Sequence, residues 1–202
     1  SPMDVSHIRP HIHRRPMSIR KRKTVGIDLG TTNTVVARNF ETLPMEGGGC
    51  VMPSAVAFLP SGAKLIGKAA RRRRAMDPRN TILSAKRVIG ARWRSSYTSQ
   101  FREHYPYDLL EGPDGWAVFK TRAGIVCPVE VGSTIIAGLC ERTNCPVQDV
   151  HAVVTAPVGF DNRRREATAL AVSNAKFASV RVIEEPIATA LDYAHEKGIV
   201  HR

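Results

Sequence analysis

The sequence lacks the features that assign many chains to a class at first reading. No apolar run reaches the roughly 18 residues that a membrane-spanning helix needs, so we expect no membrane partner. No G-x-G-x-x-G, G-x-x-x-x-G-K-[ST] or G-x-S-x-G motif occurs, so the loops of dinucleotide-binding, P-loop and α/β-hydrolase folds are missing. With 43% apolar and 24% charged residues, the 202-residue chain is instead typical of one large globular domain or two small subdomains.

Disulfide and metal-site patterns are missing as well. The four cysteines show no C-x-x-C spacing and the seven histidines form no ligand cluster, so we expect no zinc site. No secretory apolar segment opens the chain. We therefore predict reduced thiols and a cytoplasmic location. The cysteines are Cys50, Cys127, Cys140 and Cys145.

Acidic residues are scarce relative to basic ones. The chain has 30 Lys and Arg against 18 Asp and Glu, a formal charge of +12, so a nucleic-acid or acidic-membrane partner must be considered. Residues 1–23 contain seven of the basic residues and no aromatic residue, and we predict a disordered basic arm. A solvated tail is the simpler interpretation of this arm, and weak non-specific nucleic-acid binding is the alternative. For the run Arg71–Arg74 on a predicted helix, a solvated helix face is the simpler interpretation and a binding site is the alternative.

Short apolar patterns predict an alternation of strands and helices. Val25, Ile27 and Leu29 alternate with small or polar residues in a first strand, a turn follows at 30–33, and residues 34–37 form a second strand. Further strands are predicted over 53–59, 115–119, 151–156 and 179–184. Helices are predicted over 68–76, 80–89, 129–143, 163–176 and 187–197. A hairpin followed by alternating helices and strands indicates a mixed sheet of the α/β class.

Asp28 and the turn after it are the first candidate for chemistry. Asp28 lies on the small-residue side of its strand, directly before the turn Gly30-Thr31-Thr32. A carboxylate there can hold a hydrated Mg²⁺, and a glycine turn lets backbone N–H groups approach a phosphate. A hairpin turn built from ordinary turn residues is the alternative.

Charged residues near helix ends are the other candidates. Lys86 is predicted on the helix 80–89, which Asn80 would cap and Gly90 would end, and alone it is a lysine whose stem covers apolar surface. Glu184-Glu185 precedes a helix whose dipole favours carboxylates anyway. The run Arg163–Arg165 opposes the dipole of its own helix, so at least one of these arginines is expected to have a partner.

Six segments, taken in order, resemble the DnaK-type 70-kDa heat-shock chaperones. The first, VGIDLGTTNTVVA at 25–37, is similar to that family's first phosphate-binding motif. The next five are MPSAVAF (52–58), LIGKAA (65–70), NTILSAKRVIG (80–90), AVVTAPVGFDNRRREAT (152–168) and VRVIEEPIATALDYA (180–194). Together they extend over most of 24–198, which is far more specific than any one of them.

The resemblance implies the actin-like ATPase fold, which is related to ribonuclease H. This chain would be its first lobe, with a mixed sheet, flanking helices and a small inserted α+β subdomain. The core subdomain would comprise 24–54 and 127–202, and the outer subdomain would comprise 55–126. The family's second phosphate loop, adenosine pocket and peptide-binding domain would follow Arg202, so we expect a truncated form of the family's domain.

The resemblance also implies a nucleotide site. Asp28 would hold Mg²⁺ through water, Lys86 would be the catalytic lysine, and Glu185 would be the cleft glutamate near the attacking water. The loop that cradles the phosphates of ATP or ADP would comprise Gly30, Thr31, Thr32 and Asn33.

A relay from nucleotide to surface is implied as well. Pro157 would be the switch proline, Arg165 the arginine paired with it, and Arg181 would lie where J-domain cochaperones dock. The chain departs from the family's pattern after Pro157, where a tyrosine is missing, and at Glu184, where Asn is common.

Three functions follow as hypotheses. The first is a chaperone ATPase domain that, with a second lobe, hydrolyses ATP to drive the folding of client proteins, as in a stress response. The second is a non-hydrolysing binding module on the same lobe. The third is a basic RNA-associated protein in which the arm and Arg71–Arg74 act together.

Overall fold

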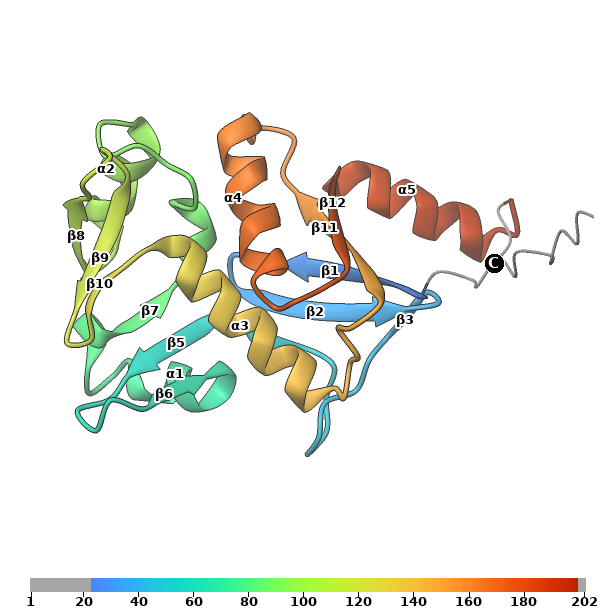
Figure 1. Cartoon of the computed structure of the whole chain (residues 1–202), viewed down its shortest axis with the longest axis horizontal. Coiled ribbons are helices and arrows are strands. Elements are labelled where there is room, and N and C mark those ends of the chain that lie inside the picture. The colour runs from blue at the N-terminus through green and yellow to red at the C-terminus, as the bar shows by residue number, and fades with distance from the viewer. Residues whose placement is uncertain (1–22, 200–202) are drawn as a thin grey trace, which may run out of the picture.

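A mixed six-stranded sheet forms the larger part of the molecule, and two three-stranded sheets form the smaller part (Figure 1). The structure, a computed structural model, describes residues 23–199. The predicted arm at 1–23 therefore lies outside the described residues, except for Lys23, which is the first residue of a strand and not part of an arm. The mixed sheet with its flanking helices confirms the predicted α/β class.

The six-stranded sheet has the order β12-β11-β1-β2-β3, and β4 also pairs with β2. Strands β1, β11 and β12 are parallel to one another, whereas β2 is antiparallel to β1, β3 and β4. The strands are β1 (Lys23–Leu29), β2 (Asn33–Arg38), β3 (Glu41–Thr42), β4 (Met52–Pro53), β11 (Val150–Ala156) and β12 (Ser179–Glu184). The predicted strands at 25–29, 34–37, 151–156 and 179–184 are thus confirmed.

One face of this sheet is covered by two helices, α3 (Pro128–Arg142) and α4 (Asn162–Ser173), which pack against each other. Val25, Ile27 and Leu29 point into this layer and are at most 2% exposed, because side chains of a strand alternate between faces. Pro128 begins α3, and the side chain of Asp161 caps α4 by accepting a hydrogen bond from the N–H of Arg164 at 2.9 Å. The main hydrophobic core includes this layer and continues into the smaller part of the molecule.

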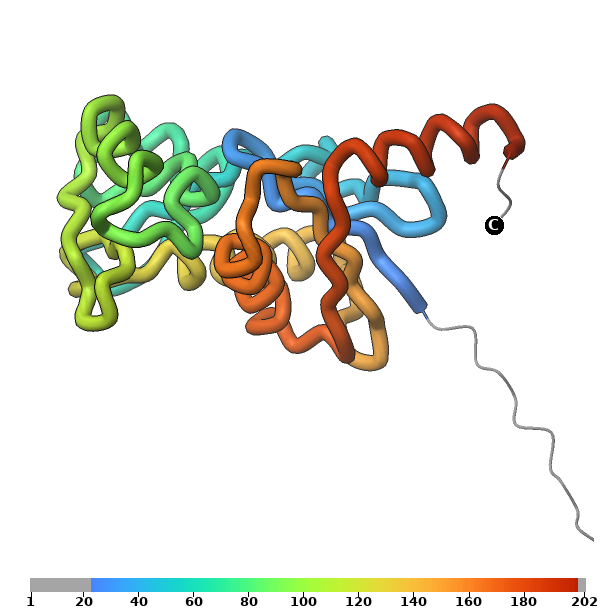
Figure 2. The backbone as a smooth tube through the Cα atoms, turned by 90° about the horizontal axis from the view of Figure 1, so that it is seen from above, coloured from blue at the N-terminus to red at the C-terminus, as the bar shows by residue number. Residues whose placement is uncertain are grey.

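The opposite face of the sheet is contacted by α5 (Glu185–Glu196), which follows β12 directly. Seen from above, α4 and α5 extend to opposite sides of the strands (Figure 2). Gly26, Asp28 and Thr155 lie on this open face and, with residues of α5, line a cavity of about 850 Å³. The face that carries Asp28 is therefore open to a ligand.

The smaller part contains two sheets, of order β6-β5-β7 and β10-β9-β8, and a helix, α2 (Ser96–His104). The rings of Phe101, Tyr105, Tyr107 and Phe119 form a cluster there, in which the ring centroids of five pairs lie 4.3–6.0 Å apart, some stacked and some edge-on. The other elements are β5 (Ala55–Phe58), β6 (Lys64–Ile66), α1 (Gly67–Arg73), η1 (Pro78–Asn80), β7 (Thr81–Leu83), η2 (Ala85–Arg87), β8 (Asp108–Glu111), β9 (Ala117–Thr121) and β10 (Gly124–Val126), where η marks a 3₁₀ turn. The division into core and outer subdomains stays a prediction.

The predicted helix over 80–89 is wrong. Residues 81–83 form β7, which pairs with β5 in the register Val56↔Ile82, and residues 85–87 form the 3₁₀ turn η2. Ser84 between them has a φ of +59°, which no continuous helix accommodates. Asn80 caps no helix, since its amide donates to Asp77 and its oxygen accepts from the N–H of Arg122.

Candidate functional site

The turn after β1 is held in shape by Ser54, a residue that the sequence did not indicate. The Ser54 hydroxyl donates to the carbonyl of Gly30 at 2.8 Å and lies 2.8 Å from the hydroxyl of Thr34. The N–H of Ser54 donates to the carbonyl of Thr32 at 2.8 Å. Ser54 is 5% exposed, and its one signal in the sequence is a polar residue inside an apolar run. The turn is therefore a braced loop and not a free hairpin tip.

Glycine is the only residue type that fits at position 30, where this turn begins. A Cβ atom at this position would lie 2.2 Å from the backbone oxygen of Asn33, far inside van der Waals contact. Asn33 is already part of β2, where it pairs with Pro53 of β4. Of the predicted loop residues, Thr31 lines a cavity of about 450 Å³.

Asp28 lies on the same side of β1 as Gly26, as predicted, and this side is the open face of the sheet. Its Oδ1 accepts a hydrogen bond from the Thr155 hydroxyl on the neighbouring strand at 2.9 Å. No group of three or more His, Cys, Asp or Glu side chains among residues 23–199 is arranged to hold a metal ion directly. A single carboxylate with a neighbouring hydroxyl fits Mg²⁺, which usually keeps several water ligands and takes one or two carboxylates.

Lys86 and Glu185 meet across the molecule. The Lys86 Nζ lies 3.0 Å from Oε1 of Glu185, although 99 residues separate them in sequence. The Lys86 side chain is only 5% exposed, whereas that of Glu185 is 46% exposed. Lys86 is therefore not a helix-surface lysine, since it belongs to the 3₁₀ turn η2 and points toward the first residue of α5.

Arg165 ties the segment after Pro157 to the end of β12. Its Nε donates to the carbonyl of Phe160 at 3.1 Å, and the N–H of Phe160 donates to the carbonyl of Pro157 at 3.0 Å. Its guanidinium also forms an ion pair with Glu184 at 2.6 Å. The expectation that one arginine of 163–165 has a partner is confirmed. The acid at Glu184, unusual for the resembled family, is the partner of Arg165.

Arg181 does not join these contacts. It is an exposed residue of β12, opposite Val153 of β11. The cavity of about 450 Å³ does bring together three of the predicted site residues, namely Thr31, Lys86 and Pro157. Asp28 and Glu185 both line the cavity on the open face.

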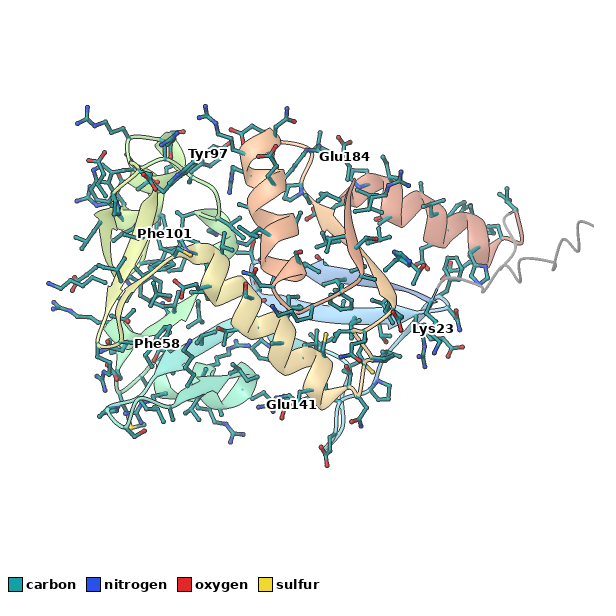
Figure 3. The ribbon with its side chains drawn as sticks, viewed as in Figure 1. Lys23, Phe58, Tyr97, Phe101, Glu141 and Glu184 are labelled. Atoms are coloured by element: carbon teal, nitrogen blue, oxygen red, sulfur yellow. The ribbon has the colours of Figure 1, made fainter. Side chains whose placement is uncertain are left out.

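A second buried cation lines the smaller cavity and was not singled out from the sequence. Arg164 is 3% exposed, and the ring of Tyr97 from α2 lies 4.1 Å from its guanidinium carbon. Figure 3 shows Tyr97 beside the first turns of α4. Burial lowers the pKa of Arg164 from its ordinary value, and Tyr97 and Asp161 partly offset that effect. Nothing local distinguishes Arg164 from its two neighbouring arginines, so only the tertiary structure identifies it.

The cysteines lie outside the site residues described above. All four are free thiols, as predicted. Cys140 and Cys145 are buried at the end of α3, where the N–H of Cys145 donates to the carbonyl of Cys140 at 2.9 Å. A hydrogen bond between the two thiols lowers the pKa of Cys145, and the same contact together with burial raises that of Cys140.

Comparison with known proteins agrees with the resemblance noted above. Residues 24–200 match the family model described as Hsp70 protein. Proteins named chaperone protein HscA homolog, from Burkholderia mallei, Burkholderia pseudomallei and Burkholderia thailandensis, are 39% identical to this chain over 189 residues. The match covers 91% of this chain and 30% of each of these relatives, so the chain spans about a third of their length or less. Within residues 23–199, none of the helices has the length and apolar character needed to cross a membrane.

Proposed function

Because the chain belongs to the Hsp70 family, whose ATPase domain has the actin-like fold, we propose that residues 23–199 supply one half of a nucleotide site. The other half would come from a second lobe, as in the complete relatives. The observation that carries this proposal is the Lys86–Glu185 pair. These two side chains are 99 residues apart in sequence and meet at 3.0 Å. Lys86 lines the cavity that also contains Thr31, and Glu185 lines the cavity that also contains Asp28.

The braced turn would hold the phosphates of ATP or ADP. Gly30 permits the tight approach of the backbone, and Ser54 holds the carbonyls of Gly30 and Thr32. Backbone N–H groups and threonine hydroxyls are then available to phosphate oxygens. The residues that would contact the phosphates are Gly30, Thr31, Thr32 and Asn33.

Three charged residues, Asp28, Lys86 and Glu185, would have separate roles in binding the metal and in hydrolysis. The Asp28 carboxylate would hold Mg²⁺ through water, and the metal would neutralise phosphate charge when bound. Lys86 would stabilise the charge that develops on the transferred phosphoryl group, and Glu185 would orient the lysine and the attacking water. A buried ammonium that is already aimed by a carboxylate needs little reorganisation, which favours such a role.

The contacts of Arg165 support a link between this site and the surface. Pro157 lines the same cavity as Lys86, and Arg165 connects its segment to Glu184, next to Glu185. We propose that a change at the phosphates reaches β12 through this connection. Arg181, exposed on that strand, would then lie at a surface for a J-domain cochaperone, and client folding and a cytoplasmic location would follow from the complete family architecture.

The test is a chimera in which the second lobe of one of the HscA homologs follows this chain. We expect the chimera to hydrolyse ATP in the presence of Mg²⁺ and the 202-residue chain alone to show no appreciable turnover, because one lobe offers only part of the binding energy that positions the phosphate. Lys86→Ala or Glu185→Gln should lower the rate of the chimera on the order of 10²–10³-fold.

Lys68→Ala is the matched control, since Lys68 is an exposed lysine on α1 and should leave the rate unchanged. A folded chimera that hydrolyses ATP regardless of Lys86 and Glu185 would refute the assigned roles. A folded chimera that binds nucleotide without turnover would favour the non-hydrolysing module.

A further inference from the structure

Arg164 is a buried cation without a carboxylate partner. Its exposed fraction is 3%, and no carboxylate of residues 23–199 forms an ion pair with it. A buried charge is costly unless hydrogen bonds or other charges compensate it. The nearby charge of Asp161 offsets part of this cost, and the rest of the compensation comes from the groups that the guanidinium contacts.

Three backbone carbonyls of one turn provide most of this compensation. The Arg164 Nε donates to the carbonyl of Ile89 at 3.2 Å, and one terminal nitrogen donates to the carbonyls of Lys86 at 3.2 Å and Arg87 at 2.9 Å. Lys86 and Arg87 are the last two residues of the 3₁₀ turn η2, and Ile89 lies two residues beyond it. The carbonyls at the end of a short helical turn have acceptor capacity to spare, and that of Lys86 also accepts from the N–H of Ile89 at 3.4 Å. The guanidinium therefore caps the turn that carries Lys86.

Two aromatic rings hold the guanidinium in place. The rings of Phe160 and Tyr97 lie 3.9 Å and 4.1 Å from its central carbon. Phe160 belongs to the segment after Pro157, and Tyr97 belongs to α2 of the smaller part. The Nζ of Lys86 lies 6.0 Å from the same Phe160 ring. Arg164 thus joins its own segment, which contains Phe160, to the part of the chain that contains the turn after Lys86 and Tyr97, and Lys86 lies beside this junction.

Gly90 allows the turn to come this close to α4. It has a φ of +63°, and a Cβ atom there would lie 2.9 Å from the Cα of Arg164 and 2.9 Å from the Cβ of Ala167. The backbone after Lys86 and the first turn of α4 are therefore in direct contact.

We propose that Arg164 is a positioning residue for Lys86. By capping the carbonyls of residues 86, 87 and 89, it fixes the turn so that the buried Lys86 ammonium reaches Glu185. A lysine at 164 would keep the charge but not the function, because an ammonium lacks the planar fork that donates to several carbonyls at once. The role of Lys86 in catalysis rests on the function proposed above, whereas its placement by Arg164 does not.

The test measures the accessibility of the Lys86 amine in the 202-residue chain without nucleotide. Trace acetylation with acetic anhydride, resolved by mass spectrometry, gives the labelling of Lys86 relative to the exposed Lys68 of the same molecule. Iodoacetamide labelling of Cys140, which is buried near the C-terminal end of α3, reports global opening in parallel. Each variant is measured well below its own Tm.

We expect Arg164→Gln and Arg164→Lys to raise the relative labelling of Lys86 about tenfold, because opening of the turn now exposes the amine, while labelling of Cys140 stays unchanged. Tyr97→Leu removes one ring from a half-exposed position and should raise the relative labelling of Lys86 about threefold. Arg163→Gln, a change at the exposed neighbour on the same helix turn, should have no effect.

Lys86 that stays protected in folded Arg164→Gln or Arg164→Lys chains would overturn the proposal, as would equal increases at Lys86 and Cys140, which mark a general loss of stability. If neither Arg164 variant folds, the Tyr97→Leu variant tests the proposal, and unchanged labelling of Lys86 in that variant overturns it. Failure of the chimera to bind nucleotide would instead refute the proposed function and leave these outcomes unaffected.

Discussion

Removing the carboxylate of Glu185 should destabilise the fold more than removing the charge of Lys86. Glu185→Gln leaves the Lys86 ammonium, 5% exposed, without its counter-charge. Two unit charges at 4 Å attract by about 4 kcal/mol at an effective dielectric constant of about 20 and by about 1 kcal/mol in water. Because Glu185 is 46% exposed, solvent screens the pair, and we expect the free energy of unfolding to fall by about 1–2 kcal/mol.

Lys86→Met should behave differently because it removes the buried charge and keeps an apolar stem. We expect its free energy of unfolding to stay within about 1 kcal/mol of the unaltered chain, and the double variant to recover most of the loss caused by Glu185→Gln. Urea unfolding of the four chains measures the difference, and thermal unfolding should show a drop of about 3–6 °C for Glu185→Gln. Equal losses for both single variants would refute the reasoning, since they would mean that the attraction itself stabilises the fold.

Three further predictions follow from the described contacts and the charge. Gly30→Ala should lower the free energy of unfolding by about 1–3 kcal/mol, because its Cβ meets the oxygen of Asn33 at 2.2 Å, whereas Gly26→Ala, with no atom within 4 Å, is the near-neutral control in the same urea experiment. Burial raises the pKa of Tyr107 from its ordinary value, so the neutral phenol stabilises the fold below pH 10, and this stabilisation is lost as the pH rises through the pKa of the folded chain. Tyr107→Phe should abolish the alkaline loss of stability. At neutral pH it should lower the free energy of unfolding by about 1 kcal/mol or more, because the N–H of Leu83 loses the hydroxyl that accepts its hydrogen bond at 2.8 Å. RNA binding should be weak, fall steeply with salt in a gel-shift titration, and disappear when residues 1–22 are deleted; tight binding that survives the deletion would place nucleic-acid recognition within residues 23–202.

The strands that carry the site were predictable because their signal is local. The alternation of Val25, Ile27 and Leu29 reflects one buried face, and the structure buries these three residues as the pattern requires. The same local signal misled at Ile82, Ala85 and Ile89, whose spacing is typical of a helix. These side chains are all buried, but Ile82 belongs to a strand that pairs with Val56. A short apolar run thus predicts which side chains are buried better than it predicts whether they belong to a helix or a strand.

The contacts that hold the site together were beyond local reasoning. Ser54 lies 24 residues from Gly30, and Arg164 lies 75 residues from Ile89, so no periodicity relates them. The helix α2, which contributes Tyr97, was missed because within it only Thr98 and Phe101 are buried and no apolar repeat marks it. The resemblance to a family implied that Lys86 and Glu185 belong to one site, and their direct pairing is seen only in the structure.

The long sequence separations at the site also determine when it can form during folding. Asp28 and Thr155 are 127 residues apart, and Lys86 and Glu185 are 99 residues apart. Closing such loops costs chain entropy before any contact repays it, so these pairs cannot form until β11 and β12 have joined β1. A partly folded chain can therefore contain the braced turn at Gly30 before the pairs Asp28–Thr155 and Lys86–Glu185 exist, and any property that depends on these two pairs reports only the molecules that have completed the sheet.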